Sequence, residues 1–124
     1  MVADAARLGA RTRRQLGRVA APCVSTISAF EISALHAAGR LLFNQPVERW
    51  IRESIATAGF RVLDLEAGIA IDAGSIPAST LPDPIDRLLV ATAREYQLPL
   101  VTGDRRIVDY ASRTRLVRVV DAST

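Results

Sequence analysis

The stretch LPDPIDRLLVATAREYQLPLVTGD, residues 81–104, decides the expected fold. Asp83 followed by Pro84 is typical of a helix start, because aspartate caps free backbone amides and proline suits the first helical position. Apolar residues then recur at helical spacing as far as about Tyr96, and the run PLVT at 99–102 is typical of a buried strand. A helix that leads into a buried strand predicts an α/β domain with a largely parallel sheet.

Helices and strands are expected to alternate along the rest of the chain as well. Alternating apolar residues predict strands, whereas apolar residues three and four apart predict helices. In a sheet of this kind, ligands collect beyond the carboxyl ends of the strands. The expected strands cover residues 21–27, 61–65 and 116–120, the expected helices cover 1–19, 28–40, 46–57, 66–73 and 105–110, and a loop covers 74–82.

Length and composition are those of one globular domain. The chain has 124 residues, of which 49% are hydrophobic and 23% are charged. Its sequence has no apolar run of 18 residues, so no transmembrane helix is expected, and the arginine-rich first residues do not resemble a secretory signal. The single cysteine, Cys23, cannot form an internal disulfide, which predicts a reducing, cytoplasmic setting.

Four carboxylates follow expected strands or begin expected helices: Glu31, Asp83, Asp86 and Asp104. If the strand ends share one edge of the sheet, these acids can meet although they lie far apart in the sequence. Clustered carboxylates repel one another, so they need a cation or shared protons. Oxygen ligands without histidine or cysteine favour magnesium or manganese, which can activate water and stabilise the charge of phosphodiester cleavage.

Each acid also has a purely structural explanation. Ser28 and Glu31 fit a capping box, in which serine and glutamate bind the first amides of a helix. Asp83 fits an N-cap, and Asp86 lies in the first turn, where the helix dipole favours a negative charge. Asp104 can cap the short helix that follows it. The two explanations are compatible, since an acid in a first turn still points toward the edge of the sheet.

All 16 basic residues are arginine. The planar guanidinium suits phosphate recognition because it donates hydrogen bonds in pairs, but a GC-rich coding sequence explains the same bias. Arg87 follows Asp86, and Arg105 follows Asp104, so both are expected to bind phosphates near the acids. Ion pairs at the surface are the alternative for these two arginines.

Three segments in this order resemble the PIN-domain family, in particular its VapC toxin branch. VSTISAFEI at 24–32 resembles the family's second strand and the helix after it. LPDPIDRLLVATA at 81–93 resembles the central helix, and LPLVTGD at 98–104 resembles the next strand and its acid. The resemblance implies a three-layer α/β/α fold with a mainly parallel central sheet, formed by a single domain over residues 1–124.

The resemblance also implies a function and a set of site residues. By position, Glu31, Asp86 and Asp104 match the second, third and fourth catalytic and metal-binding acids, Asp83 an accessory acid, and Thr102 a hydroxyl beside the fourth acid. The implied protein is the toxin of a type II toxin–antitoxin system, a magnesium- or manganese-dependent ribonuclease that cleaves single-stranded RNA. A cognate VapB-type antitoxin would neutralise it, and family members commonly form homodimers.

The first residues, MVADAARL at 1–8, depart from the family pattern. No apolar strand leads into Asp4, so Asp4 is not assigned the role of first acid. The domain is therefore expected to be N-terminally incomplete and to lack the opening strand, either because the true start lies upstream or because the protein is shorter. Loss of a central strand would leave unpaired edges on both of its neighbours.

Two other functions compete with cleavage. An incomplete set of acids favours a degenerate, non-catalytic module that binds an antitoxin or RNA without cutting. A magnesium-dependent phosphotransfer domain of the receiver type would also gather acids at strand ends. The chain has no lysine to serve the phosphate, which disfavours that second alternative.

Overall fold

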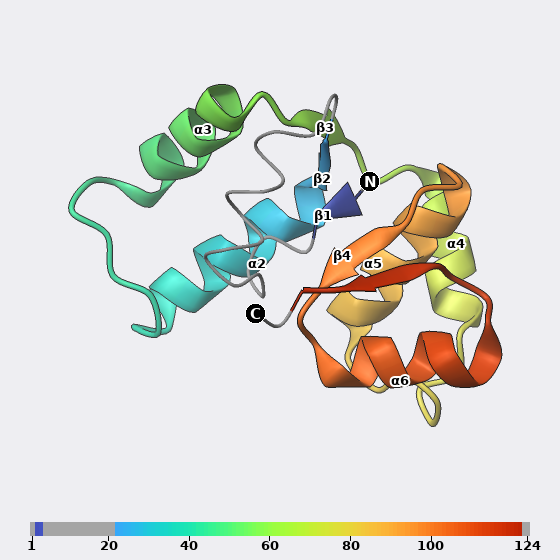
Figure 1. Cartoon of the computed structure of the whole chain (residues 1–124). Helices are drawn as coiled ribbons and strands as arrows, with labels where there is room; N and C mark the ends of the chain where they lie inside the picture. The colour runs from blue at the N-terminus through green and yellow to red at the C-terminus, as the bar shows by residue number, and fades with distance from the viewer. Residues whose placement is uncertain (1, 4–21, 123–124) are drawn as a thin grey trace.

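The structure is a computed structural model that describes residues 2–3 and 22–122 (Figure 1). Its centre is a five-stranded sheet in the order β3-β2-β1-β4-β5, and every neighbouring pair is parallel. Strands β3 and β5 form the two edges. The strands are β1 (Val2–Ala3), β2 (Cys23–Ser25), β3 (Arg61–Leu63), β4 (Leu100–Thr102) and β5 (Val119–Asp121).

Helices connect the parallel strands and cover both faces of the sheet. Right-handed crossovers that run in opposite directions from the centre place their helices on opposite faces. Figure 1 accordingly shows α2 and α3 on one side of the strands and the other three helices on the opposite side. The helices are α2 (Thr26–Ala37), α3 (Val47–Ala58), α4 (Ala67–Ser75), α5 (Pro84–Glu95) and α6 (Arg105–Thr114). The expected α/β/α architecture with a parallel sheet is confirmed.

The core forms around α5 and β4, the two elements of the stretch at 81–104. Leu89 of α5, Leu100 of β4 and Ile107 of α6 are completely buried and belong to one apolar cluster. Ala91, on another side of α5, packs instead with Ile69 of α4. Apolar burial is the main stabilising contribution to folding, so this helix and strand anchor the domain.

The expectation that the N-terminal strand is missing was wrong. Val2 and Ala3 form β1, which pairs with β2 on one side and with β4 on the other. The expected helix at 1–19 was therefore wrong for these two residues, and the rest of it, residues 4–21, lies outside the described residues. A strand of two residues is too short to show an alternating pattern, and it is defined by backbone pairing with both neighbours.

The start of α2 also differs from the prediction. The helix begins at Thr26, and the hydroxyl oxygen of Ser25 accepts a hydrogen bond from the backbone amide of Ile27 at 3.0 Å. Ser25, rather than Ser28, is therefore the N-cap, and the predicted capping box of Ser28 and Glu31 is wrong. The reason is that β2 ends at Ser25, where its pairing with Leu63 of β3 also ends.

Helix α3 packs less deeply than its pattern predicts. Trp50, Ile51 and Ile55 were predicted to form a buried side, but none of the α3 residues, all of them described, is buried. These three side chains line a groove of about 630 Å³ between α2 and α3.

Among the described residues, no helix is long and apolar enough to cross a membrane.

The cap assignment predicts the effect of a substitution at Ser25. Ser25→Ala removes the acceptor for the Ile27 amide and is expected to lower the free energy of unfolding by about 1 kcal/mol. Urea unfolding followed by circular dichroism measures this change. Ser33→Ala, at an exposed position of the same helix, is the control. An equal loss in both variants would contradict the assignment of Ser25 as the N-cap.

Candidate functional site

The topology brings the predicted acids toward the carboxyl edge of the sheet, which is the edge where the parallel strands end. Glu31 lies on α2, which directly follows β2, and Asp104 lies two residues beyond the end of β4. Because β2 and β4 both run parallel to β1, which lies between them, their carboxyl ends are on the same edge. Asp86 lies in the first turn of α5, and α5 packs against α2. The three acids therefore come from elements that meet at this edge.

Two of the acids are buried, which their structural explanation does not require. The exposed fraction is 1% for Asp86 and 8% for Glu31. Removing a carboxylate from water is strongly unfavourable unless charge or hydrogen bonds compensate for it. Ionisable side chains that are removed from water concentrate at functional sites, and structural ion pairs are the alternative explanation.

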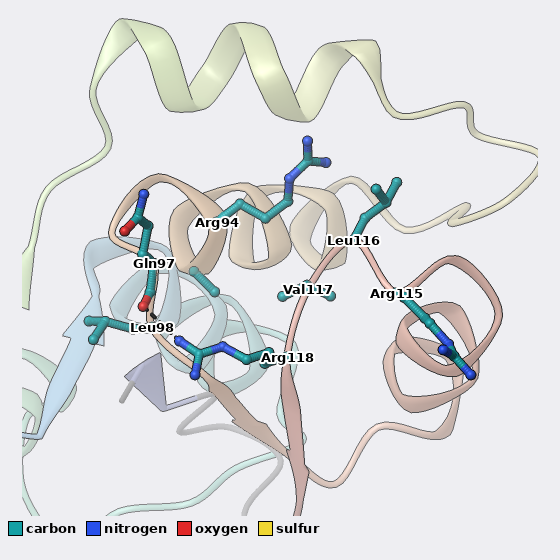
Figure 2. Close-up of a pocket in the computed structure, with 8 residues that line it drawn as sticks. Arg94, Gln97, Leu98, Arg115, Leu116, Val117 and Arg118 are labelled. Atoms are coloured by element: carbon teal, nitrogen blue, oxygen red, sulfur yellow. Dashed lines mark hydrogen bonds between the residues drawn. The ribbon is translucent and has the colours of Figure 1, made fainter.

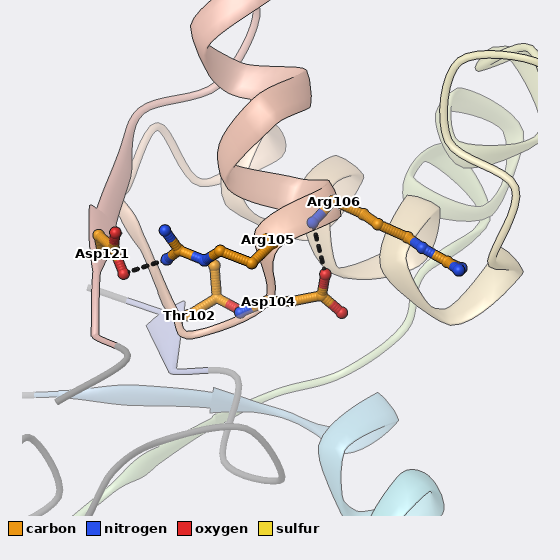
Figure 3. Close-up of polar contacts among 5 residues, drawn as sticks. All are labelled: Thr102, Asp104, Arg105, Arg106 and Asp121. Carbon is orange, nitrogen blue, oxygen red and sulfur yellow. Dashed lines mark hydrogen bonds and ion pairs between the residues drawn. The ribbon is translucent and has the colours of Figure 1, made fainter.

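The two remaining acids do cap helices. An oxygen of Asp83, Oδ1, accepts a hydrogen bond from the backbone amide of Ile85 at 2.9 Å at the start of α5. Oδ1 of Asp104 accepts one from the backbone amide of Arg106 at 2.8 Å at the start of α6 (Figure 3). Both predicted N-caps are confirmed, and both acids are half-buried. Capping fixes the direction in which each carboxylate leaves the backbone.

Thr102 holds the turn that carries Asp104. Its side chain is completely buried, and its hydroxyl oxygen accepts a hydrogen bond from the backbone amide of Asp104 at 3.1 Å. Its carbonyl oxygen accepts another from the amide of Ala122, which follows β5. The hydroxyl thus fixes the backbone between β4 and α6, and the predicted position of Thr102 beside the acid is what the structure has.

The two candidate RNA-binding arginines differ in their surroundings. Arg105 is exposed and forms an ion pair with Asp121 at the end of β5, and Figure 3 shows it extending toward that carboxylate. The hydrogen bond to Asp121 is the main cause that raises the pKa of Arg105. Arg87 is half-buried on α5, next to Asp86. Sequence reasoning missed Asp121, because no local pattern links it to a residue 16 positions away.

The acids have the chemistry that a hard divalent cation requires, although they do not form a compact metal cluster. Within residues 2–3 and 22–122, no group of three or more His, Cys, Asp or Glu side chains is arranged to hold a metal ion. Carboxylate oxygens are nevertheless the preferred ligands of magnesium and manganese. The donor set therefore fits such an ion, and its binding by these acids stays a prediction.

Asp4 was left out of the predicted site because no strand precedes it. The structure removes this reason, since β1 ends at Ala3, the preceding residue in the sequence. Asp4 itself lies outside the described residues.

Comparison with known families identifies this arrangement of elements. The sequence model of one protein family, the PIN domain, matches residues 4–113. The chain belongs to the PIN domain family. This confirms that the segments at 24–32, 81–93 and 98–104 resemble that family. The alternative of a receiver-type phosphotransfer domain is therefore dropped.

A curated protein is similar to the chain in sequence. Over 84 residues, the chain is 36% identical to Ribonuclease VapC22 of Mycobacterium tuberculosis (strain ATCC 25618 / H37Rv). The match covers 68% of this chain and 63% of the relative. The chain therefore spans less than two thirds of the length of the curated relative that it matches.

Two solved structures share the fold. VapBC2 from Rickettsia felis, bound to a DNA fragment from its promoter, is matched with a TM-score of 0.63 and 12% identity, over 90% of this chain and 82% of that chain. A toxin–antitoxin complex from Klebsiella pneumoniae is matched with a TM-score of 0.61 and 18% identity, over 92% of this chain and 86% of that chain. At these identities the likeness concerns the fold.

The cap of α6 predicts how substitutions at Asp104 affect stability. Asp104→Ala is expected to lower the free energy of unfolding by about 1 kcal/mol, whereas Asp104→Ser is expected to preserve it, because serine caps a helix about as well as aspartate. Urea unfolding of both variants measures the difference. Asp109→Ala, at an exposed position of α6, serves as the comparison. If serine is as unfavourable as alanine, Asp104 does not stabilise α6 by capping it.

Proposed function

We propose that the protein is a ribonuclease toxin of a toxin–antitoxin system that cleaves single-stranded RNA with the help of magnesium or manganese. The observation that carries this proposal is the burial of Glu31 and Asp86 on helices that pack together beyond the carboxyl edge of a PIN-domain sheet. The sequence similarity to a protein named as a ribonuclease supports it.

Each site residue has a defined part in the proposed reaction. Glu31, Asp86 and Asp104 would hold the cation, which supplies an activated water molecule and offsets negative charge on the phosphate. Thr102 fixes the backbone of Asp104 through the hydrogen bond from its amide. Asp83 caps α5 and thereby sets the position of Asp86 one turn later.

The arginines near the acids would bind the RNA backbone. Contacts to phosphate oxygens position a nucleic acid without reading its sequence. Arg87 is adjacent to Asp86 and is the stronger candidate. Arg105 is already paired with Asp121, so its contribution to RNA binding requires that pair to be shared or broken.

A VapB-type antitoxin is the proposed inhibitor of this activity. The support is structural, since the matched chains come from complexes described as VapBC2 and as toxin–antitoxin. We further propose that the protein acts in the cytoplasm, where its RNA substrate lies. Residues 1–124 would form a single domain, and two copies of the chain would form a homodimer.

A non-catalytic module that binds RNA or an antitoxin is the second candidate. It is favoured by one observation, the absence of a ready-made metal cluster among the described residues. The two functions separate when RNA binding and RNA cleavage are measured on the same protein, with and without manganese.

Cleavage is expected to depend on the metal and on the acids. With manganese, the wild-type chain should cut a single-stranded RNA, and chelation should stop it. Asp86→Asn and Asp104→Ser should each lower the rate at least about 100-fold, since each loses a carboxylate that would hold the cation. Electrophoresis of an end-labelled RNA measures the rates.

Two controls make this test specific. Asp109→Asn removes an exposed acid of α6 that lies outside the proposed site, and it should leave the rate unchanged. Thermal unfolding should show that manganese stabilises the wild type but not Asp86→Asn, because an ion that binds the folded state raises its melting temperature. RNA binding without any cleavage would identify the non-catalytic module instead.

A further inference from the structure

A row of arginines leads from the candidate site to the opposite edge of the sheet. Arg106 lies two residues after Asp104, at the beginning of α6, and Arg113 lies seven residues further, on the same exposed side of the helix. Arg115 and Arg118 follow the end of α6. We call Arg106, Arg113, Arg115 and Arg118 the arginine row. Arg106 and Arg113 are seven residues apart on α6, so this part of the row spans about 10 Å along the helix.

The row ends at a pocket on the amino edge of the sheet. This pocket has a volume of about 270 Å³ and lies where the chain enters β4 and β5 (Figure 2). Arg94, Arg115 and Arg118 line it together with Gln97 and Leu116, and none of the described residues that line it is acidic or aromatic. The pocket thus has three arginines and no described acid around it, and Figure 2 shows their guanidinium groups extending in different directions from it.

The described residues place one acid, Asp109, on the same exposed side of α6 as Arg106 and Arg113, and ion pairs neutralise little of the arginine row. Among residues 2–3 and 22–122, none forms an ion pair with Arg106, Arg113 or Arg115. Arg118 donates a hydrogen bond to the neutral carbonyl oxygen of Gln97 at 2.9 Å, which leaves its charge uncompensated. The other arginine of the pocket, Arg94, lies 3.6 Å from a carboxylate oxygen of Asp72 and is partly neutralised.

Helix dipoles explain only a part of this row. Arg113 and Arg115 lie at the carboxyl end of α6, where a positive charge is favourable. Arg106 lies in the first turn of the same helix, where the dipole disfavours a positive charge. The helix dipole therefore accounts for the charges of Arg113 and Arg115 but not for that of Arg106.

We propose that the arginine row binds the phosphate backbone of the RNA strand outside the candidate site. This inference rests on the proposed function and extends its substrate surface from the carboxyl edge to the amino edge of the sheet. Guanidinium groups bind phosphate in pairs of hydrogen bonds, and a row that begins beside Asp104 suits a strand held at the acids. None of the described residues that line the pocket is aromatic, and contacts to phosphate carry no sequence information, so the proposed contact is independent of sequence.

The double variant Arg113→Gln/Arg115→Gln tests the row in the full-length chain. Fluorescence anisotropy with a labelled 20-nucleotide RNA measures binding between 50 and 300 mM salt, in an Asp86→Asn background that prevents cleavage. Each lost phosphate contact lowers the slope of log K against log salt by about 0.7 for a single strand, so we expect a decrease of about 1.4. Arg40→Gln/Arg49→Gln removes the same charge from exposed positions on the α2–α3 side of the sheet and is the matched control.

Cleavage by the otherwise wild-type chain gives an independent readout. With manganese, Arg113→Gln/Arg115→Gln should raise KM for the 20-nucleotide RNA several-fold and leave KM for a four-nucleotide RNA unchanged, because only the longer strand reaches the row. The kcat should not change for either RNA.

The outcomes distinguish the inference from the function on which it rests. If the wild type cleaves RNA but the double variant and its control have equal salt slopes, the arginine row is overturned and the proposed function stands. If the wild type neither binds nor cleaves RNA, the proposed function fails and the row loses its ligand. If the double variant loses binding of an acidic peptide, such as hexaglutamate, but keeps binding of RNA, the surface binds protein and the inference is wrong.

Discussion

The pairing of two residues at the beginning of the chain is the constraint on which the site depends. Val2 and Ala3 pair with β2 on one side and with β4 on the other, all in the same direction. This pairing fixes which edge of the sheet receives the ends of both neighbours. Glu31 follows one neighbour and Asp104 follows the other, so the backbone alone places both acids at the same edge of the sheet.

Burial then gives the site its chemical character. Asp86 and Glu31 are removed from water. Asp83 and Asp104 each accept a hydrogen bond from a backbone amide at the start of a helix. Carboxylates in these surroundings attract a cation more strongly than carboxylates on an open surface, since water no longer screens their charge. The same acids thus order the helices and provide the oxygen ligands that the proposed reaction requires.

Long elements with a clear pattern could be predicted from the sequence, and short elements defined by pairing could not. Helix α5 and the buried strand after it follow directly from residues 81–104, including the cap at Asp83. Strand β1 has no periodicity, and the choice between Ser25 and Ser28 as a cap depended on where the pairing with β3 ends. For the site, the positions of the acids followed from topology, whereas their burial and the partner of Arg105 depended on residues distant in the sequence.

The two outermost strands have a consequence for how the molecule behaves in a crowded solution. Strands β3 and β5 have three residues each, so each border of the sheet offers only a few backbone groups to another chain. Short edge strands offer few unpaired backbone groups to strands from neighbouring molecules, and this is one way in which natural sheets avoid edge-to-edge aggregation. Val62 and Val120 are exposed on those borders, and the shortness of the strands limits how far another chain could pair beside them.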